Sequence, residues 1–245
     1  MPSQPDVTER DREHHERVDP HRGGRSLSDV ILGGQDGVVN VLGVLLGVAA
    51  AGAEARIILA AGLATTFAES ISMAAVAYTS RLADADVYRS EQAREYRHVA
   101  DVPELERAEV RDLYARKGFR GEMLERVVDT ITANKDVWVA VMMAEEHRLA
   151  PTSRREALRA AFIVGGSAVV GSLIPVLPFA FLGIGVASWV SVGVAALALF
   201  VVGAYKARVT VGHPGKSGLE LALIGTVSAV AGYAVGLLFR APPGL

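Results

Sequence analysis

Residues 30–53 read VILGGQDGVVNVLGVLLGVAAAGA, an apolar stretch in which Asp36 is the only charged residue. A transmembrane helix needs about 20 mostly apolar residues, so this stretch predicts a membrane span. Residues 57–80, IILAAGLATTFAESISMAAVAYTS, predict a second span that holds a single acid, Glu69. A carboxylate near the bilayer centre costs about 2.5–3.5 kcal/mol on insertion scales, so such groups generally handle ions or protons. The alternative is that both acids only fix the packing of helices.

The composition supports a membrane protein and narrows its chemistry. Hydrophobic residues make up 51% of the 245 residues, aromatic residues only 6%, and glycine is abundant, as in closely packed membrane helices. The chain has no cysteine, which excludes disulfides, thiolate metal sites and cysteine nucleophiles. Any metal must therefore bind to oxygen, imidazole or thioether ligands. Residues 1–26 are polar, and we expect them to form a disordered leader rather than a signal peptide.

The hydropathy pattern predicts an all-α membrane protein with five transmembrane helices. No charged residue occurs from Ala160 to Tyr205, a stretch long enough for two helices, and we expect their turn near Pro175 and Pro178. The five expected spans lie near 30–52, near 57–81, twice within 160–205, and near 219–239. The domains follow as a leader (1–26), transmembrane helices 1 and 2 (27–82), a cytoplasmic insert (83–152) and transmembrane helices 3 to 5 (153–241).

The distribution of basic residues predicts the orientation. In a five-span chain, nine Lys and Arg residues near the ends of the spans fall on one side, whereas only Arg56 and Arg240 fall on the other. Because cytoplasmic loops carry the excess of Lys and Arg, we expect the amino terminus and the insert to be cytoplasmic and the carboxyl terminus to be outside. The nine residues are Arg22, Arg25, Arg81, Arg154, Arg155, Arg159, Lys206, Arg208 and Lys216.

The insert is too charged to cross a membrane, since residues 84–150 hold 15 of the chain's 27 acidic residues. The second span continues without Gly or Pro as far as Pro103, so its helix can run on into the cytoplasm. Breaks at Gly118 and Gly121 complete a prediction of three helices, near 84–99, 103–117 and 121–147.

The acidic residues of the insert recur at helical spacing, together with histidine and methionine. Carboxylates suit hard or borderline divalent cations, and imidazole and thioether extend the choice toward Fe(II). The alternative is an ordinary solvated helix face, in which Arg94, Arg97 and Arg107 neutralise the acids. The candidate metal ligands are Glu91, Glu95 and His98 on one helical face, Glu106 and Glu109 on the next helix, and Met142, Met143, Glu145 and Glu146 in the run MMAEEH.

The order of these parts resembles the vacuolar iron transporter family. The similarity covers roughly residues 26–240 and depends on LGGQDGVVNVLGVLLGVAAA in the first span, ESISMAAVAYTS in the second, and an acidic insert that ends in MMAEEHRL. The resemblance implies a five-span homodimer that exchanges Fe(II), and in some members Mn(II), for protons. It also implies that the insert forms a metal-binding domain. It implies no prosthetic group, because the metal ion is the transported ligand.

The resemblance also assigns roles to residues. Asp36 and Met73 match residues of the translocation path, and the insert acids Glu95, Glu106, Glu109 and Glu146 match metal-binding glutamates, with Met142 and Met143 beside the last. In two places the chain departs from the pattern. His98 stands where the family usually has a glutamate. Thr65 stands where many members carry a second-span carboxylate, and Glu69, four residues on and on the same helical face, is the candidate substitute.

The resulting hypothesis is a transporter that exports Fe(II) or Mn(II) from the cytoplasm in exchange for protons, across a bacterial plasma membrane. The alternative is a membrane-tethered metal buffer or sensor, which binds metal and moves none. A hydrolase is not supported, since the sequence contains no HExxH or G-x-S-x-G motif, and it has no phosphate-binding loop followed by lysine. The leader's EHHER is a weak metal signal. Gly33, Gly37, Gly43 and Gly47 could form a helix–helix seam that favours a dimer.

Overall fold

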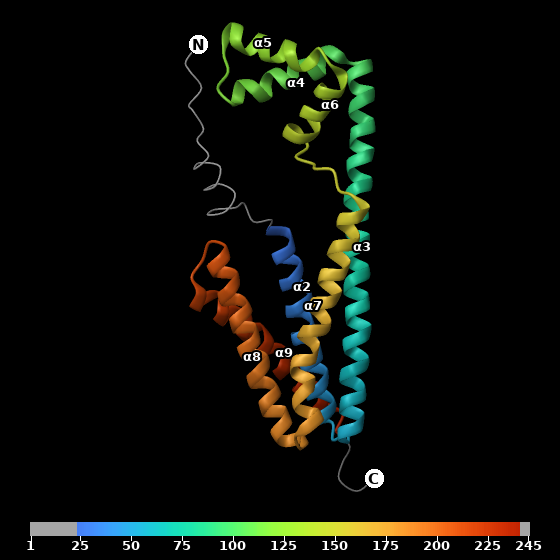
Figure 1. The fold of residues 1–245 in the computed structure, drawn as a ribbon, viewed down its shortest axis with the longest axis vertical. Helices are drawn as coiled ribbons and strands as arrows, with labels where there is room; N and C mark the ends of the chain where they lie inside the picture. The colour runs from blue at the N-terminus through green and yellow to red at the C-terminus, as the bar shows by residue number, and fades with distance from the viewer. Residues whose placement is uncertain (1–23, 241–245) are drawn as a thin grey trace, which may run out of the picture. The chain divides into compact units, whose positions relative to one another are not determined.

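A computed structural model describes residues 24–240, and every described regular element is helical (Figure 1). The expected leader lies almost entirely outside the described residues. The spans fall in α2 (Gly24–Ala50), α3 (Ala55–Asp101), α7 (Arg154–Phe181), α8 (Ile184–Val209) and α9 (Pro214–Leu238). Between α3 and α7 lie α4 (Pro103–Arg116), α5 (Gly121–Thr132), α6 (Lys135–Val141) and the π-helical turn η2 (Met142–Glu146).

Within residues 24–240, five helices are long and apolar enough to cross a membrane, as expected. The chain divides into two compact units. The membrane unit comprises the described residues up to Ala74 and from Ile163 onward, and the insert unit comprises residues 75–162. α3 continues without a break from the second span to Asp101, two residues before Pro103, which confirms the predicted extension.

The turn between the third and fourth spans was predicted in the wrong place. Pro175 and Pro178 both lie inside α7, and the helix ends at Phe181. Gly183, in an extended conformation, precedes the first residue of α8. Membrane helices tolerate proline because neighbouring helices and hydroxyl groups satisfy backbone groups near the interruption. Here the Ser191 hydroxyl of α8 donates to the Pro175 carbonyl at 2.8 Å.

The glycines of α2 form seams with other helices of the same chain. A Cβ added at Gly37 would lie 2.4 Å from the Ala168 carbonyl oxygen of α7, so only glycine permits this approach. On α9, a Cβ at Gly232 would lie 2.1 Å from the Gly43 carbonyl oxygen. The glycine seam is therefore confirmed, but it packs α2 within the subunit. It gives no support for a dimer, which corrects that part of the sequence argument.

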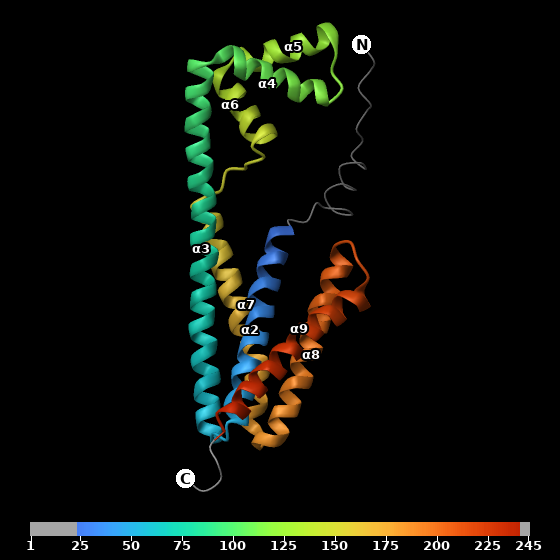
Figure 2. The same ribbon diagram turned by 180° about the vertical axis from the view of Figure 1, so that it is seen from behind.

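The insert unit has its own apolar core. Val110, Val128 and Val139 are fully buried there, one each from α4, α5 and α6, and α4 and α5 lie side by side in both views (Figures 1 and 2). The predicted helix over 121–147 is wrong, because it is interrupted after Thr132. Asn134 caps α6 by accepting hydrogen bonds from the backbone N–H groups of Asp136 and Val137. An asparagine side chain that bonds its own backbone in this way favours a helix start over a helix interior.

Candidate metal centre

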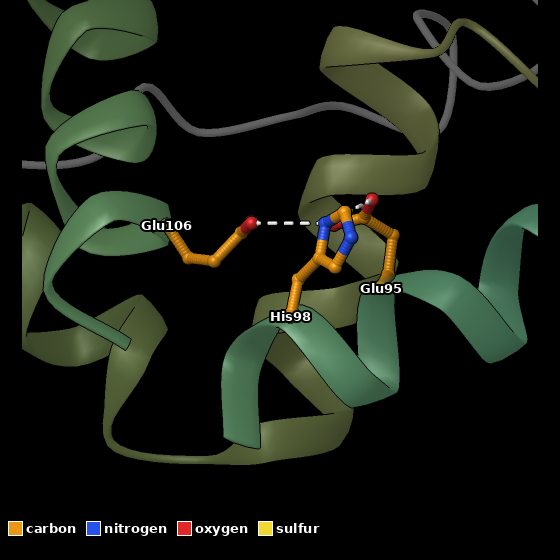
Figure 3. Close-up of side chains that lie close together, drawn as sticks. All are labelled: Glu95, His98 and Glu106. Atoms are coloured by element: carbon orange, nitrogen blue, oxygen red, sulfur yellow. Dashed lines mark ion pairs between the residues drawn. The ribbon is translucent and has the colours of Figure 1, made fainter. Parts of the chain in front are cut away.

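Three predicted ligands come together in the insert unit. Glu95 and His98 lie one turn apart near the end of α3, and Glu106 lies in the first turn of α4, facing them across the break at Pro103 (Figure 3). His98 Nδ1 is 3.2 Å from Glu106 Oε1 and 4.0 Å from Glu95 Oε1. One ligand atom from each residue lies within 4.8 Å of the others. The arrangement places two oxygens and one nitrogen around a common point.

The two carboxylates are buried and incompletely paired. Glu95 and Glu106 are only 3% and 2% exposed, and in the described part of the chain their Oε2 atoms have no hydrogen-bond partner. Burial raises the pKa of Glu106 from 4.5 to about 7, and the charges of Glu95 and Glu109 add to this rise. Buried carboxylate oxygens that lack a hydrogen-bond partner are costly to an apo protein, and a bound cation removes that cost.

The donor set suits a divalent transition metal. Bonds to oxygen and nitrogen of about 2.0–2.2 Å keep two donors on one ion within roughly 4.4 Å of each other. The ligand atoms of the three residues lie within 4.8 Å of one another, so small side-chain rotations would bring all three to one ion. Half of the His98 side chain is accessible, 45% by area, which gives an ion a path to the two buried acids. Imidazole with carboxylate is a common ligand set for Fe(II) and Zn(II).

The remaining predicted acids are distributed differently. Glu91 pairs with Arg94 at 3.0 Å and Glu145 with Lys117, so basic side chains neutralise both, as the solvated-face alternative describes. Glu109 is half-buried one turn after Glu106, and its charge acts on both Glu106 and Glu146. Partial burial, together with Glu109, raises the pKa of Glu146. Glu109 and Glu146 thus lie near the cluster, whereas Glu91 and Glu145 have other partners.

The two candidate methionines are core residues in this structure. Met142 and Met143 are 0% and 1% exposed, in the same apolar cluster as Val110 and Val139. A thioether can occupy such a position for its packing alone, since methionine fills irregular gaps well. Their role as metal ligands remains a prediction.

His147 is a site residue that the sequence argument missed. Its Nε2 lies 3.0 Å from Glu95 Oε1, and the other oxygen, Oε2, has no hydrogen-bond partner in the described residues. Burial lowers the pKa of His147, but the hydrogen bond and charge of Glu95 outweigh this effect and the net shift is upward. The π turn at Met142–Glu146 changes the helical register, and the His147 N–H bonds to the Met142 carbonyl five residues back. A regular helical wheel therefore misplaces this side chain.

A second group of predicted residues lies in the membrane unit. Glu69 of α3 interacts electrostatically with Asp36 of α2, so the two intramembrane acids are neighbours. Thr65 and Met73 lie one turn before and one turn after Glu69, on the same face of α3, and all three are half-buried. Asn40, one turn after Asp36, donates from Nδ2 to Glu69 Oε1 at 2.7 Å. The sequence argument also missed Asn40, although its spacing from Asp36 was a usable signal.

Five apolar helices with paired intramembrane acids, together with a helical insert that carries a metal-type cluster, define an integral membrane protein that handles cations. Comparison with known proteins identifies the family. The model of the VIT family matches residues 27–237, so the chain belongs to the VIT family. This is a family of transporters, and the chain is not an enzyme.

Named relatives agree with this assignment. The chain is 32% identical to vacuolar iron transporter 1 of Oryza sativa subsp. japonica over 222 residues, which covers 90% of this chain and 88% of the relative. It is 33% identical to the vacuolar iron transporter of Centaurea cyanus, with 91% and 90% covered. The vacuolar iron transporter of Plasmodium falciparum is 27% identical, with 88% and 82% covered.

Proposed function

We propose that this chain transports Fe(II), or Mn(II), out of the cytoplasm in exchange for protons. The observation that carries the proposal is the pair of neighbouring acids, Asp36 and Glu69, inside helices apolar enough to span a membrane. Two carboxylates offset part of the cost of bringing a divalent cation into a low dielectric. The choice of Fe(II) as the transported ion comes from the relatives, which are named as iron transporters.

The insert cluster supplies the ion to the membrane unit in this mechanism. Glu95, His98 and Glu106 bind the ion on the cytoplasmic side, and the surrounding acids raise its local concentration. Glu109 and Glu146 contribute charge, with Met142 and Met143 as further candidate ligands. The metal-binding domain then corresponds to residues 83–152.

Proton exchange follows from the chemistry of the ligands. A carboxylate binds either a proton or a metal ion at the same oxygen, so the arrival of metal displaces protons. In the membrane unit the ion passes to Asp36 and Glu69, with Met73 and Thr65 beside them. Protonation of these acids from the far side then releases the ion outward, and transport needs no ATP.

The distribution of Lys and Arg supports a cytoplasmic amino terminus and insert, with the carboxyl terminus outside. The composition favours a bacterial plasma membrane. We also propose a homodimer, as the resemblance to the vacuolar iron transporter family implies. Chemical crosslinking in native membranes should yield a dimer, and a product limited to monomer would argue against it.

Ion flux separates this function from the metal buffer or sensor. Proteoliposomes that contain the full chain should accumulate Fe(II) well above empty liposomes when the lumen is made more acidic than the outside. A buffer would bind Fe(II) to a fixed amount per protein, with no accumulation in the lumen. Release of the accumulated ion by detergent, but not by an external chelator, identifies luminal metal.

A further inference from the structure

The hydrogen bond between Asn40 and Glu69 connects two membrane helices through their side chains. Asn40 lies on α2, one turn after Asp36, and Glu69 lies on α3. The amide Nδ2 donates to Glu69 Oε1 over 2.7 Å, a normal length for a hydrogen bond to a carboxylate. The bond therefore restricts the rotation of the Glu69 carboxylate about its terminal torsion.

This restriction leaves one carboxylate oxygen available. In the part of the chain that the structure describes, Glu69 Oε2 is buried and has no hydrogen-bond partner. Oε1 is held by the amide, and the charge of Asp36 acts on the same carboxylate, so Oε2 is the unpartnered oxygen of an acid that neighbours Asp36. Carboxylates that bind metal are commonly oriented by a second group in this way.

Packing alone does not account for an asparagine at this position. Asn40 is exposed on the membrane unit, between the apolar residues Val39 and Val41. An amide in contact with lipid is unfavourable unless it is hydrogen-bonded, and an apolar residue at position 40 would avoid that cost. Its amide oxygen Oδ1 also remains directed away from the donated hydrogen bond, and amide oxygens are ligands of hard divalent cations.

We propose that Asn40 is the positioning residue of Glu69. Its amide holds Oε1, aims Oε2 at the cation beside Asp36, and so makes Glu69 the second-helix carboxylate of the path in place of Thr65. The proposal rests on the proposed function, since it concerns the intramembrane site through which the ion passes. It adds a residue to that site and a reason for the departure at Thr65.

The test is the concentration dependence of Fe(II) uptake by proteoliposomes that contain the full chain. Asn40→Leu removes the amide at nearly constant volume. Loss of a group that orients a metal ligand typically costs about 10- to 100-fold in metal affinity, so KM should rise by about that factor while kcat changes much less. Asn40→Gln retains an amide and should restore KM toward the wild-type value.

The controls separate a positioning role from a general loss of structure. Thr226→Val changes another exposed polar residue of a membrane helix, whose hydroxyl donates to the Ala222 carbonyl of its own helix, and KM should stay at the wild-type value. If Asn40→Leu does not fold, as judged by size-exclusion chromatography, Asn40→Ala carries the same test. An unchanged KM in the folded variant, with wild-type uptake intact, would overturn the role of Asn40 alone. Absence of uptake by the wild type would overturn the proposed function and this role with it.

Discussion

Asp36→Asn should abolish Fe(II) uptake by proteoliposomes. The substitution keeps the volume of the side chain and removes one of the two negative charges that neighbour each other in the membrane unit. Loss of an outer partner of a metal ligand typically costs about 10- to 100-fold in metal affinity, so the loss of a direct carboxylate ligand should cost at least this much. We therefore expect the initial rate to fall to the level of empty liposomes at any practical Fe(II) concentration.

A matched control distinguishes the loss of the carboxylate at position 36 from a general loss of one negative charge. Glu220→Gln removes a carboxylate from another membrane helix, α9, where the side chain is exposed. This variant should transport at close to the wild-type rate. Equal uptake by Asp36→Asn and the wild type, under one proton gradient, would show that the ion does not pass through the carboxylate pair.

Glu95→Gln combined with Glu106→Gln should remove tight metal binding by the insert. Both carboxylates are buried in the cluster with His98, and outer partners alone are worth about 10- to 100-fold in affinity, so the loss of two direct ligands should exceed this. Calorimetric titration of the full chain in detergent with Co(II), an air-stable substitute for Fe(II), measures it. The matched control is Glu122→Gln with Glu125→Gln, two α5 acids outside the cluster that pair with arginines.

The pH dependence gives the same cluster a second signature. Because the pKa of Glu106 is raised to about 7, protons compete with the metal below that pH, and metal affinity at pH 6 should be lower than at pH 8.

The raised pKa also affects the stability of the metal-free protein. Between pH 4.5 and about 7, Glu106 holds a proton in the folded state that it has lost in the unfolded state. The contribution of Glu106 to stability is therefore complete below pH 4.5 and decreases as the pH rises to about 7.

This decrease in stability with rising pH provides a folding control for the binding experiment. At pH 8 the apo Glu106→Gln variant should unfold at the same temperature as the wild type or at a higher one, because a neutral amide replaces a buried charge. A variant that binds metal weakly and is no less stable has lost ligands rather than structure. Unchanged Co(II) affinity in the double variant would show that these acids do not bind the metal, in agreement with the solvated-face alternative.

Much of the fold could be predicted because the bilayer imposes a simple length rule. Apolar stretches and the Pro103 break gave the five spans and the extension of the second helix. Two boundaries failed for local reasons. Pro175 and Pro178 were read as a turn, although a membrane helix accommodates proline when neighbours satisfy nearby backbone groups. The capping role of Asn134 was overlooked within an otherwise helical pattern.

The candidate site was predictable only in part, since helical spacing places residues on a face but does not say which faces meet. Spacing identified Glu95 and His98 on one helix and Glu106 on the next, and the fold brings these three together. It could not show that Glu91 and Glu145 pair with basic residues. His147 was hidden by the π turn, and Asn40 was overlooked although it lies one helical turn after Asp36.

The most direct test of the account records luminal Fe(II) and luminal pH together in proteoliposomes of the full chain. Exchange predicts that each Fe(II) uptake signal is accompanied by a rise in luminal pH, as protons leave, and that both signals disappear in Asp36→Asn. Fe(II) entry with a constant luminal pH would contradict the exchange of metal for protons at the intramembrane acids.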